Sequence, residues 1–400
     1  MSETHPLMND ITSALADNFS LTRGGPLHWL MVRLGRAGDE RQRVIRRALL
    51  LIMMTWLPLL VLSVLHGDAY GSKVSVPFLL DIAVNVRFLI AVPILILAES
   101  GIDARWRILV LQFLRSGLVP EKELPPFEAA IEKTTRLRNG VLPELLILLA
   151  AFLPVLFVRT EPLLTGISNW HATVGSDQIT PAGWWFNLVS TPIFRFLMFR
   201  WLWRMILWTY FLWRVSRLNL AYVATHTDMA AGLGFLSEGQ KAFSPIVFAG
   251  GTVIAAQVAN TITYLGASLS SQKLPMIAYG VLAIVILLAP ILVVAPVLLK
   301  VKRNALREYG VLVTRHNQLF DQKWIQRGQP SDESILGNPD ASSLVDLGSS
   351  FTVIRQMGIV PIDKPTLVTL ALAAALPMIA VALYATPTEE LIRVVLKMLG

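Results

Sequence analysis

Seven long runs of apolar residues alternate with polar segments along the chain. They lie at 48–66, 78–98, 141–158, 188–213, 245–265, 276–299 and 366–386. A helix needs about 20 mostly apolar residues to cross a hydrocarbon core that is about 30 Å thick. The pattern therefore predicts an all-α, polytopic membrane protein with about seven transmembrane helices.

Basic residues gather in every second gap between these runs. The segments 1–47, 99–140, 214–244 and 300–365 hold 26 of the 35 Lys and Arg residues, whereas the other gaps and the C-terminal tail hold five. Loops rich in Lys and Arg stay in the cytoplasm. We therefore expect a cytoplasmic N-terminus and a C-terminus on the opposite side of the membrane.

Composition agrees with this class of protein. Hydrophobic residues make up 54% of the chain and charged residues 16%, whereas a soluble domain carries about 25% charged residues. The net charge of +8 is explained by orientation and by attraction to anionic lipid headgroups, so no nucleic-acid partner is expected. The chain has no cysteine, which excludes disulfides, thiolate metal sites and thiol nucleophiles.

The predicted cytoplasmic segments also contain helices. An apolar stripe over 27–34 predicts an amphipathic helix on the membrane surface within segment 1–47. The loop 99–140 is expected to form two helices, around 106–114 and 127–137, which are separated by prolines. The sixth span is expected to continue as one helix from about Met276 to about Arg327.

Segment 300–365 is predicted to hold two helices that precede the last span in 366–400. A seam with a spacing close to 3.5 residues follows the first of them, through Ala305, Tyr309, Leu312, His316 and Leu319. The second is expected from about Ser343 to Met357, with Ser343 and Asp346 as its capping box.

Arginines inside the apolar runs are the main functional signal. Arg87 lies in the second run, and the fourth run carries Arg195, Arg200 and Arg204. The topology predicts that Arg87 and Arg200 lie at a similar depth near the bilayer midplane. A buried guanidinium there needs compensation. One alternative is that the arginines line a path for an anion. A second is that they pair with Asp81, Glu99 or Glu144, or extend to the lipid headgroups. The third is voltage sensing, which the spacing of the arginines does not favour.

Asp81 and Asn85 lie one helical turn apart in the second run. A carboxylate at that depth binds a proton or a cation, or it serves as the counter-charge of a nearby arginine. We favour the pairing. The fifth run carries Gly251, Ala255 and Ala259 at every fourth position, a stripe that allows close helix packing inside the chain or between subunits of a homo-oligomer.

The loop at 225–236 is the most motif-like segment. His226 and Asp228 offer two metal ligands, but two ligands do not make a site, so no metal is assigned. Gly232 and Gly234 match only half of a dinucleotide fingerprint and follow no predicted strand. Glycines that allow a tight turn explain the segment equally well. No cofactor is assigned, and no catalytic residue is identified.

Three short segments of the chain, taken together, resemble those of a family of uncharacterised bacterial multi-pass inner-membrane proteins. They are Phe19-Ser-Leu-Thr-Arg-Gly-Gly-Pro26, Val76-Pro-Phe-Leu-Leu-Asp81 running to Arg87, and Thr225-His-Thr-Asp228 with Gly232-Leu-Gly-Phe-Leu236. The resemblance extends over most of the chain, including 343–361, although relatives often have Pro at the position of Thr227. It implies a bacterial plasma membrane, with the C-terminus in the periplasm, and it implies no activity.

Three functions remain open at this level. The first is a channel or secondary transporter that handles a small anion through Arg87 and Arg200. The second is a membrane-embedded sensor or assembly subunit that docks a partner through its cytoplasmic helices. A membrane enzyme is the third.

Overall fold

The computed structural model describes residues 19–22, 24, 40–157, 167–172, 179–326, 334–335 and 337–386. This part of the chain is helical, and it contains isolated β-bridges but no strand. The expected helix at 27–34 and the tail after 386 lie outside the described residues.

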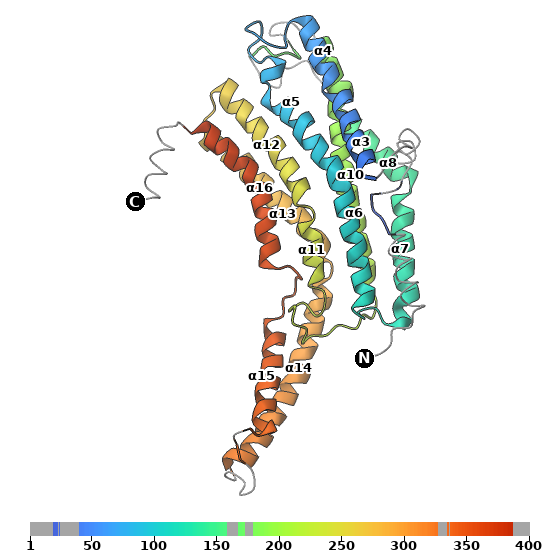
Figure 1. Cartoon of the computed structure of the whole chain (residues 1–400), viewed down its shortest axis with the longest axis vertical. Coiled ribbons are helices and arrows are strands. Elements are labelled where there is room, and N and C mark those ends of the chain that lie inside the picture. The colour runs from blue at the N-terminus through green and yellow to red at the C-terminus, as the bar shows by residue number, and fades with distance from the viewer. Residues whose placement is uncertain are drawn as a thin grey trace.

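The longer helices form an elongated bundle (Figure 1). They are α3 (Glu40–Thr55), α4 (Leu57–His66), α6 (Val92–Arg115), α7 (Leu124–Arg138), α8 (Val141–Phe152), α10 (Thr191–Ser216), α12 (Ser244–Leu265), α13 (Lys273–Leu292), α14 (Ala295–Phe320), α15 (Pro339–Gln356) and α16 (Lys364–Ala385). Short helices complete them: η1 (Phe78–Leu80), α5 (Ile82–Val86), η3 (Glu121–Glu123), η4 (Leu153–Phe157), α9 (Pro181–Trp185), α11 (Phe235–Lys241) and η6 (Leu269–Gln272). Three π-helical turns are η2 (Arg87–Ala91), η5 (Phe186–Ser190) and η7 (Asp321–Gln326).

Five helical stretches are long and apolar enough to cross a membrane. They are Gln42–His66, Ile82–Arg115, Phe235–Leu265, Leu269–Leu292 and Lys364–Ala385. A sixth stretch is added if the bent pair Glu121–Arg138 and Val141–Val155, which meet at 44°, is one span. The expected count of seven is therefore not confirmed. The difference includes 188–213. There α10 is long enough, but it carries four arginines, three of which lie in this run.

The outer surface of the bundle is apolar. Leu50, Leu146, Val281 and Leu372 are each more than half exposed. Side chains of this kind need lipid rather than water as their solvent, because burying them from water is favourable. The described bundle thus has the surface of an integral membrane protein.

Prolines accompany the irregular turns within the long helices. The π-helical turns η2 and η5 end two residues before Pro93 and Pro192, where the missing N–H interrupts the regular hydrogen-bond ladder. Another break, at 293–294, separates α13 from α14 just before Pro296. The predicted continuous sixth helix is therefore two helices.

Two other elements differ from their predicted boundaries. α6 runs unbroken through residues 98–106, so the second span and the first predicted helix of loop 99–140 are one element. α15 begins at Pro339 and is capped by Asn338, whose side chain accepts the Asp340 N–H at 2.9 Å. The Ser343 capping box is wrong, because the Ser343 hydroxyl contacts His316 and the Asp340 carbonyl instead.

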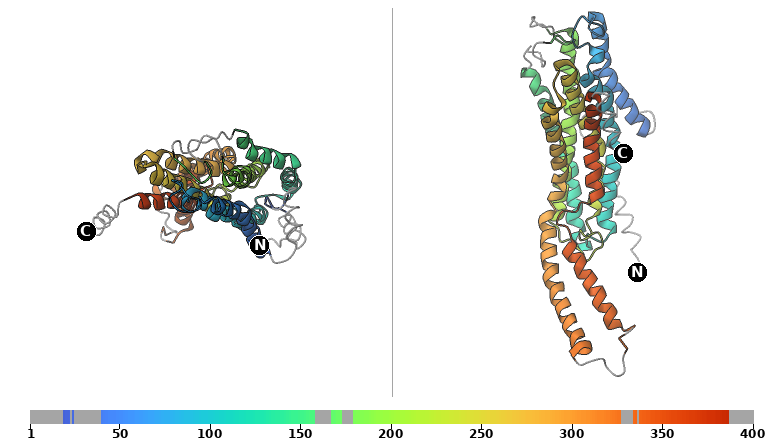
Figure 2. Two further views of the ribbon diagram at one scale, coloured as in Figure 1. Left: turned by 90° about the horizontal axis from the view of Figure 1, so that it is seen from above. Right: turned by 90° about the vertical axis from the view of Figure 1, so that its left-hand side faces the viewer.

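The α14–α15 hairpin extends from one end of the bundle, opposite the end that holds the α4–α5 connection (Figures 1 and 2). α14 has 26 residues, a length of about 39 Å at 1.5 Å per residue. The seam predicted for this helix does not form its packing face near the end of the hairpin. Leu312 and Leu319, which belong to that seam, are 51% and 57% exposed. Val313 and Phe320, one residue further along, are the more buried positions.

Candidate functional site

Asp81 and Asn85 organise the end of the bundle that carries the α4–α5 connection. Asp81 caps α5 by accepting the Val84 N–H at 3.0 Å, and it also accepts the Trp170 indole N–H at 2.9 Å and the Asn260 amide at 2.8 Å. The Asn85 side chain accepts the Trp56 indole N–H at 2.8 Å. Asp81 therefore accepts hydrogen bonds from three donors of the described structure. These donors take the place of the nearby arginine that we expected as the partner of Asp81.

Arg87 and Arg195 lie close enough to interact electrostatically. Arg87 lies in η2, and its guanidinium carbon is 5.6 Å from the Phe194 ring centre and 6.0 Å from that of Phe186. Aromatic faces attract a cation at this range. The Arg87 Nε is buried and has no hydrogen-bond partner within the described structure. The two aromatic rings and the nearby Asp81 carboxylate favour the charged guanidinium.

Arg200 and Arg204 belong to a second, separate cluster. The Arg204 Nη2 donates to the Glu99 Oε1 at 2.7 Å, and Arg47 from α3 lies 3.6 Å from the other Glu99 oxygen. Arg204 is 2% exposed, Glu99 6% and Arg200 8%. The Arg204 guanidinium also lies 4.5 Å from the Trp201 ring centre. The buried pair of Glu99 and Arg204 joins α6 to α10, and Arg47 links α3 to the same carboxylate.

The two arginine clusters lie at different depths. Glu99, the partner of Arg204, is twelve residues after Arg87 along one helical stretch. At 1.5 Å per residue this is a separation of about 18 Å. Arg200 lies one helical turn before Arg204, which brings it about 6 Å back toward the level of Arg87. Arg87 and Arg200 are therefore about 12 Å apart along the bundle, and the expectation that they share a depth is wrong.

Asp103 is a site residue that was missed in the sequence. It is fully buried, and its Oδ1 accepts the Ser20 hydroxyl at 2.7 Å and the backbone N–H groups of Leu21 and Thr22 at 3.1 and 3.2 Å. Its other oxygen lies 3.3 Å from Arg107. The available signal was the spacing of Glu99, Asp103 and Arg107 at every fourth residue, which places all three on one helix face.

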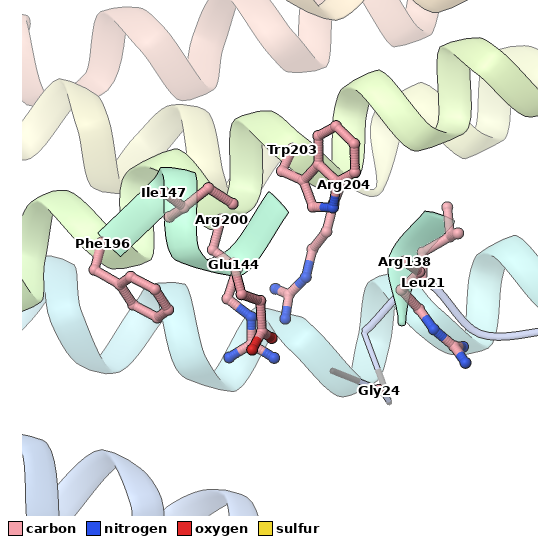
Figure 3. Close-up of a pocket in the computed structure, with 9 residues that line it drawn as sticks. All are labelled: Leu21, Gly24, Arg138, Glu144, Ile147, Phe196, Arg200, Trp203 and Arg204. Carbon is pink, nitrogen blue, oxygen red and sulfur yellow. The ribbon is translucent and has the colours of Figure 1, made fainter. Parts of the chain in front are cut away.

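A small cavity separates this N-terminal segment from the arginines. Its lining residues come from the N-terminal segment, α7, α8 and α10: Leu21, Gly24, Arg138, Glu144, Ile147, Phe196, Arg200, Trp203 and Arg204 (Figure 3). The volume is about 20 Å³, enough for about one water molecule and too small for an organic substrate. The Glu144 and Arg200 side chains extend in the same direction, and their charged ends overlap in this view (Figure 3).

The loop at 225–236 folds around the Asp228 carboxylate. Asp228 accepts the backbone N–H groups of Ala230, Gly232 and Gly234 at 2.8, 3.1 and 2.8 Å, and His226 lies 2.9 Å from it. Burial disfavours its charged form, but these hydrogen bonds outweigh that effect and hold its pKa below the ordinary value.

The loop glycines have structural roles. Gly232 has φ +93°, and a Cβ at Gly234 would lie 2.8 Å from the Asp228 Cβ. The turn explanation thus accounts for both glycines. The described residues contain no group of three or more His, Cys, Asp or Glu side chains that could hold a metal ion.

The small-residue stripe of α12 faces another helix of the same chain. A Cβ at Gly251 would lie 3.1 Å from Pro377 and 3.4 Å from the Ala374 carbonyl oxygen, both on α16. Ala255 and Ala259 are buried with Met378 and Val381 of α16. The stripe therefore lets α12 and α16 pack closely, as small residues do in membranes.

Comparison with protein-family models, with curated proteins and with solved structures gives no match to this chain. Its function is therefore argued from the geometry above.

Proposed function

We propose that this protein is a membrane-embedded docking subunit, which presents the α14–α15 hairpin to a partner protein in the cytoplasm. The observation that carries the proposal is that the hairpin leaves the bundle and exposes apolar side chains far from the apolar spans. Val311 is 71% exposed, and Leu312 and Leu319 are each more than half exposed. Exposing such side chains to water is unfavourable, so an exposed cluster of them favours a protein interface.

The hairpin is well suited to hold a partner in a fixed orientation. At its far end, the Lys323 ammonium lies 2.7 Å from the Asp340 carboxylate. At the membrane end, Lys302 donates to the Met357 carbonyl oxygen at 2.6 Å, and the Gly358 N–H donates to the Met229 carbonyl oxygen at 2.8 Å. These contacts join the hairpin to the 225–236 loop, which gives that loop a structural role in docking.

The charges around the apolar side chains indicate the chemistry of the partner. Arg303, Arg307 and Arg315 are exposed on α14 beside the apolar residues. A mixed apolar and basic helix face is complementary to an amphipathic helix with acidic flanks. A second copy of this chain would bring the same basic face, and like charges would oppose it.

Site-specific photo-crosslinking in cells tests the docking proposal. A photoreactive amino acid at Leu312 should give a discrete adduct with another protein, whereas one at the exposed Ser349 of α15 should not. Arg303→Glu together with Arg307→Glu should abolish that adduct. Equal crosslinking at the two positions, an adduct that survives the charge reversal, or an adduct with a second copy of the chain would contradict it.

The proposal includes seven crossings, with the N-terminus in the cytoplasm of a bacterial inner membrane and the C-terminus in the periplasm. The two additional crossings would be α8 and α10. In support, these two helices pack against one another, and α10 also packs against α13. A helix surrounded in this way tolerates arginines that lipid would not, because they face protein partners such as Glu99.

Anion transport is the second candidate. The buried arginines favour it, but Arg87 and Arg200 lie at different depths, and the cavity beside Arg200 is small. In this arrangement a transported anion would need the bundle to rearrange. Purified protein in liposomes should then pass chloride, and Arg200→Gln should change the flux. Liposomes that remain silent with folded wild-type protein would exclude this candidate.

A further inference from the structure

Among the described residues, more positive than negative side chains surround the cavity beside Arg200 and Arg204. Five arginines of the described structure lie in or next to this cluster: Arg47, Arg107, Arg138, Arg200 and Arg204. Three carboxylates accompany them: Glu99, Asp103 and Glu144. The described side chains thus leave an excess of two positive charges. Buried charge is costly unless it is compensated.

The geometry of Arg204 shows where compensation is lacking. Its Nη2 donates to Glu99, and its guanidinium face lies against Trp201. Its Nη1 is buried and has no hydrogen-bond partner among the described residues. Because Arg204 also lines the cavity, an acceptor placed there would satisfy a donor that otherwise loses its hydrogen bond to water.

We infer that this cavity binds one small monatomic anion, for which chloride is the natural choice. The site has guanidinium donors, an excess of positive charge and a volume of about 20 Å³. A chloride ion is only slightly larger than the water molecule that such a space accommodates, whereas phosphate or a carboxylic acid is much larger. The inference is independent of docking and of transport.

The N-terminal segment would close this site. Leu21 and Gly24 line the cavity, and the segment is held by Asp103 and by Arg138, whose Nη1 donates to the Ser20 carbonyl oxygen. A Cβ at Gly24 would lie 2.5 Å from the Arg138 Nε, so this close approach favours glycine. The bound anion and the seated segment should therefore stabilise one another.

Equilibrium binding of radioactive chloride tests the site. Full-length protein in detergent is dialysed against labelled chloride, with gluconate keeping the ionic strength constant. The wild type should retain about one chloride per chain. Arg200→Gln should weaken binding about tenfold or more, since it removes a charged donor. Arg217→Gln is the matched control, because Arg217 is an exposed arginine at the end of the same helix and does not line the cavity.

A second variant keeps the test decisive if Arg200→Gln does not fold. Glu144→Gln removes a negative charge from the cavity wall and should tighten chloride binding severalfold. The inference is wrong if the wild type retains no chloride, which would mean that the cavity holds only water. It is also wrong if Arg200→Gln binds like Arg217→Gln, or if Glu144→Gln leaves binding unchanged or weaker.

Discussion

The substitution Glu99→Gln tests the buried ion pair that joins α6 to α10. Glu99 accepts from Arg204 at 2.7 Å and lies 3.6 Å from Arg47, and both Glu99 and Arg204 are buried. Glutamine keeps the shape and one acceptor but removes the charge that compensates these guanidinium groups. Breaking a buried pair on one side costs about 3–5 kcal/mol, and the presence of two arginines favours the upper part of that range.

Thermal unfolding in detergent, followed by the fluorescence of the eleven tryptophans, measures the effect. At about 2 °C per kcal/mol for a large chain, the Tm should fall by roughly 6–10 °C. Glu132→Gln is the matched control, because Glu132 pairs with Arg136 at 2.6 Å on the exposed surface. Its Tm should change by less than about 2 °C.

A double-mutant cycle separates pairing from general damage. Glu99→Gln combined with Arg204→Gln should cost less than the sum of the two single changes, by about 1–3 kcal/mol, because the double variant leaves neither of the two partners charged. Purely additive costs, or a Glu99→Gln protein that melts within 2 °C of the wild type, would refute the idea that this pair holds the two helices together.

Three further predictions follow from other contacts. Asp103→Ala should release segment 19–22, and hydrogen exchange should then show faster exchange of its amides at unchanged protection of α6. Because the pKa of Asp228 is lowered in the folded protein, its charge stabilises the 225–236 loop above about pH 4, and this stabilisation is lost as the pH falls through that pKa. Amide exchange in this loop, corrected for its intrinsic rate, should show the loss in the wild type and not in Asp228→Asn. Gly183→Ala should lower the Tm, since its Cβ would lie 2.3 Å from the His171 carbonyl oxygen, whereas Gly348→Ala, which meets no atom within 4 Å, should raise stability by up to about 1 kcal/mol.

The apolar spans could be predicted because their signal is local. About 20 apolar residues in succession are stable in lipid as a helix, and five of the predicted runs overlap stretches of this kind. Helix ends were less predictable. The predicted second run ends at residue 98, just before Glu99, but α6 continues because Glu99 and Asp103 have buried partners that polarity alone does not show.

Side-chain partners could not be predicted in the same way. Periodicity says which face of a helix a residue occupies, but not which helix lies opposite or how far it is shifted along its axis. Asp81 lies close to Arg87 in sequence, yet it accepts from Trp170 and Asn260, which are 89 and 179 residues away. The absence of cysteine, in contrast, was certain from the sequence and is useful for experiment.

The most direct test of the account is the side of the membrane on which the hairpin lies. Because the chain has no cysteine, single cysteines can be placed at Tyr70, which is 74% exposed in the α4–α5 connection, and at the exposed Ser349 of α15. A membrane-impermeant maleimide should label Tyr70→Cys in intact cells and Ser349→Cys only after the membranes are opened. Labelling of Ser349→Cys in intact cells would contradict the account, because the hairpin would then face away from the cytoplasm.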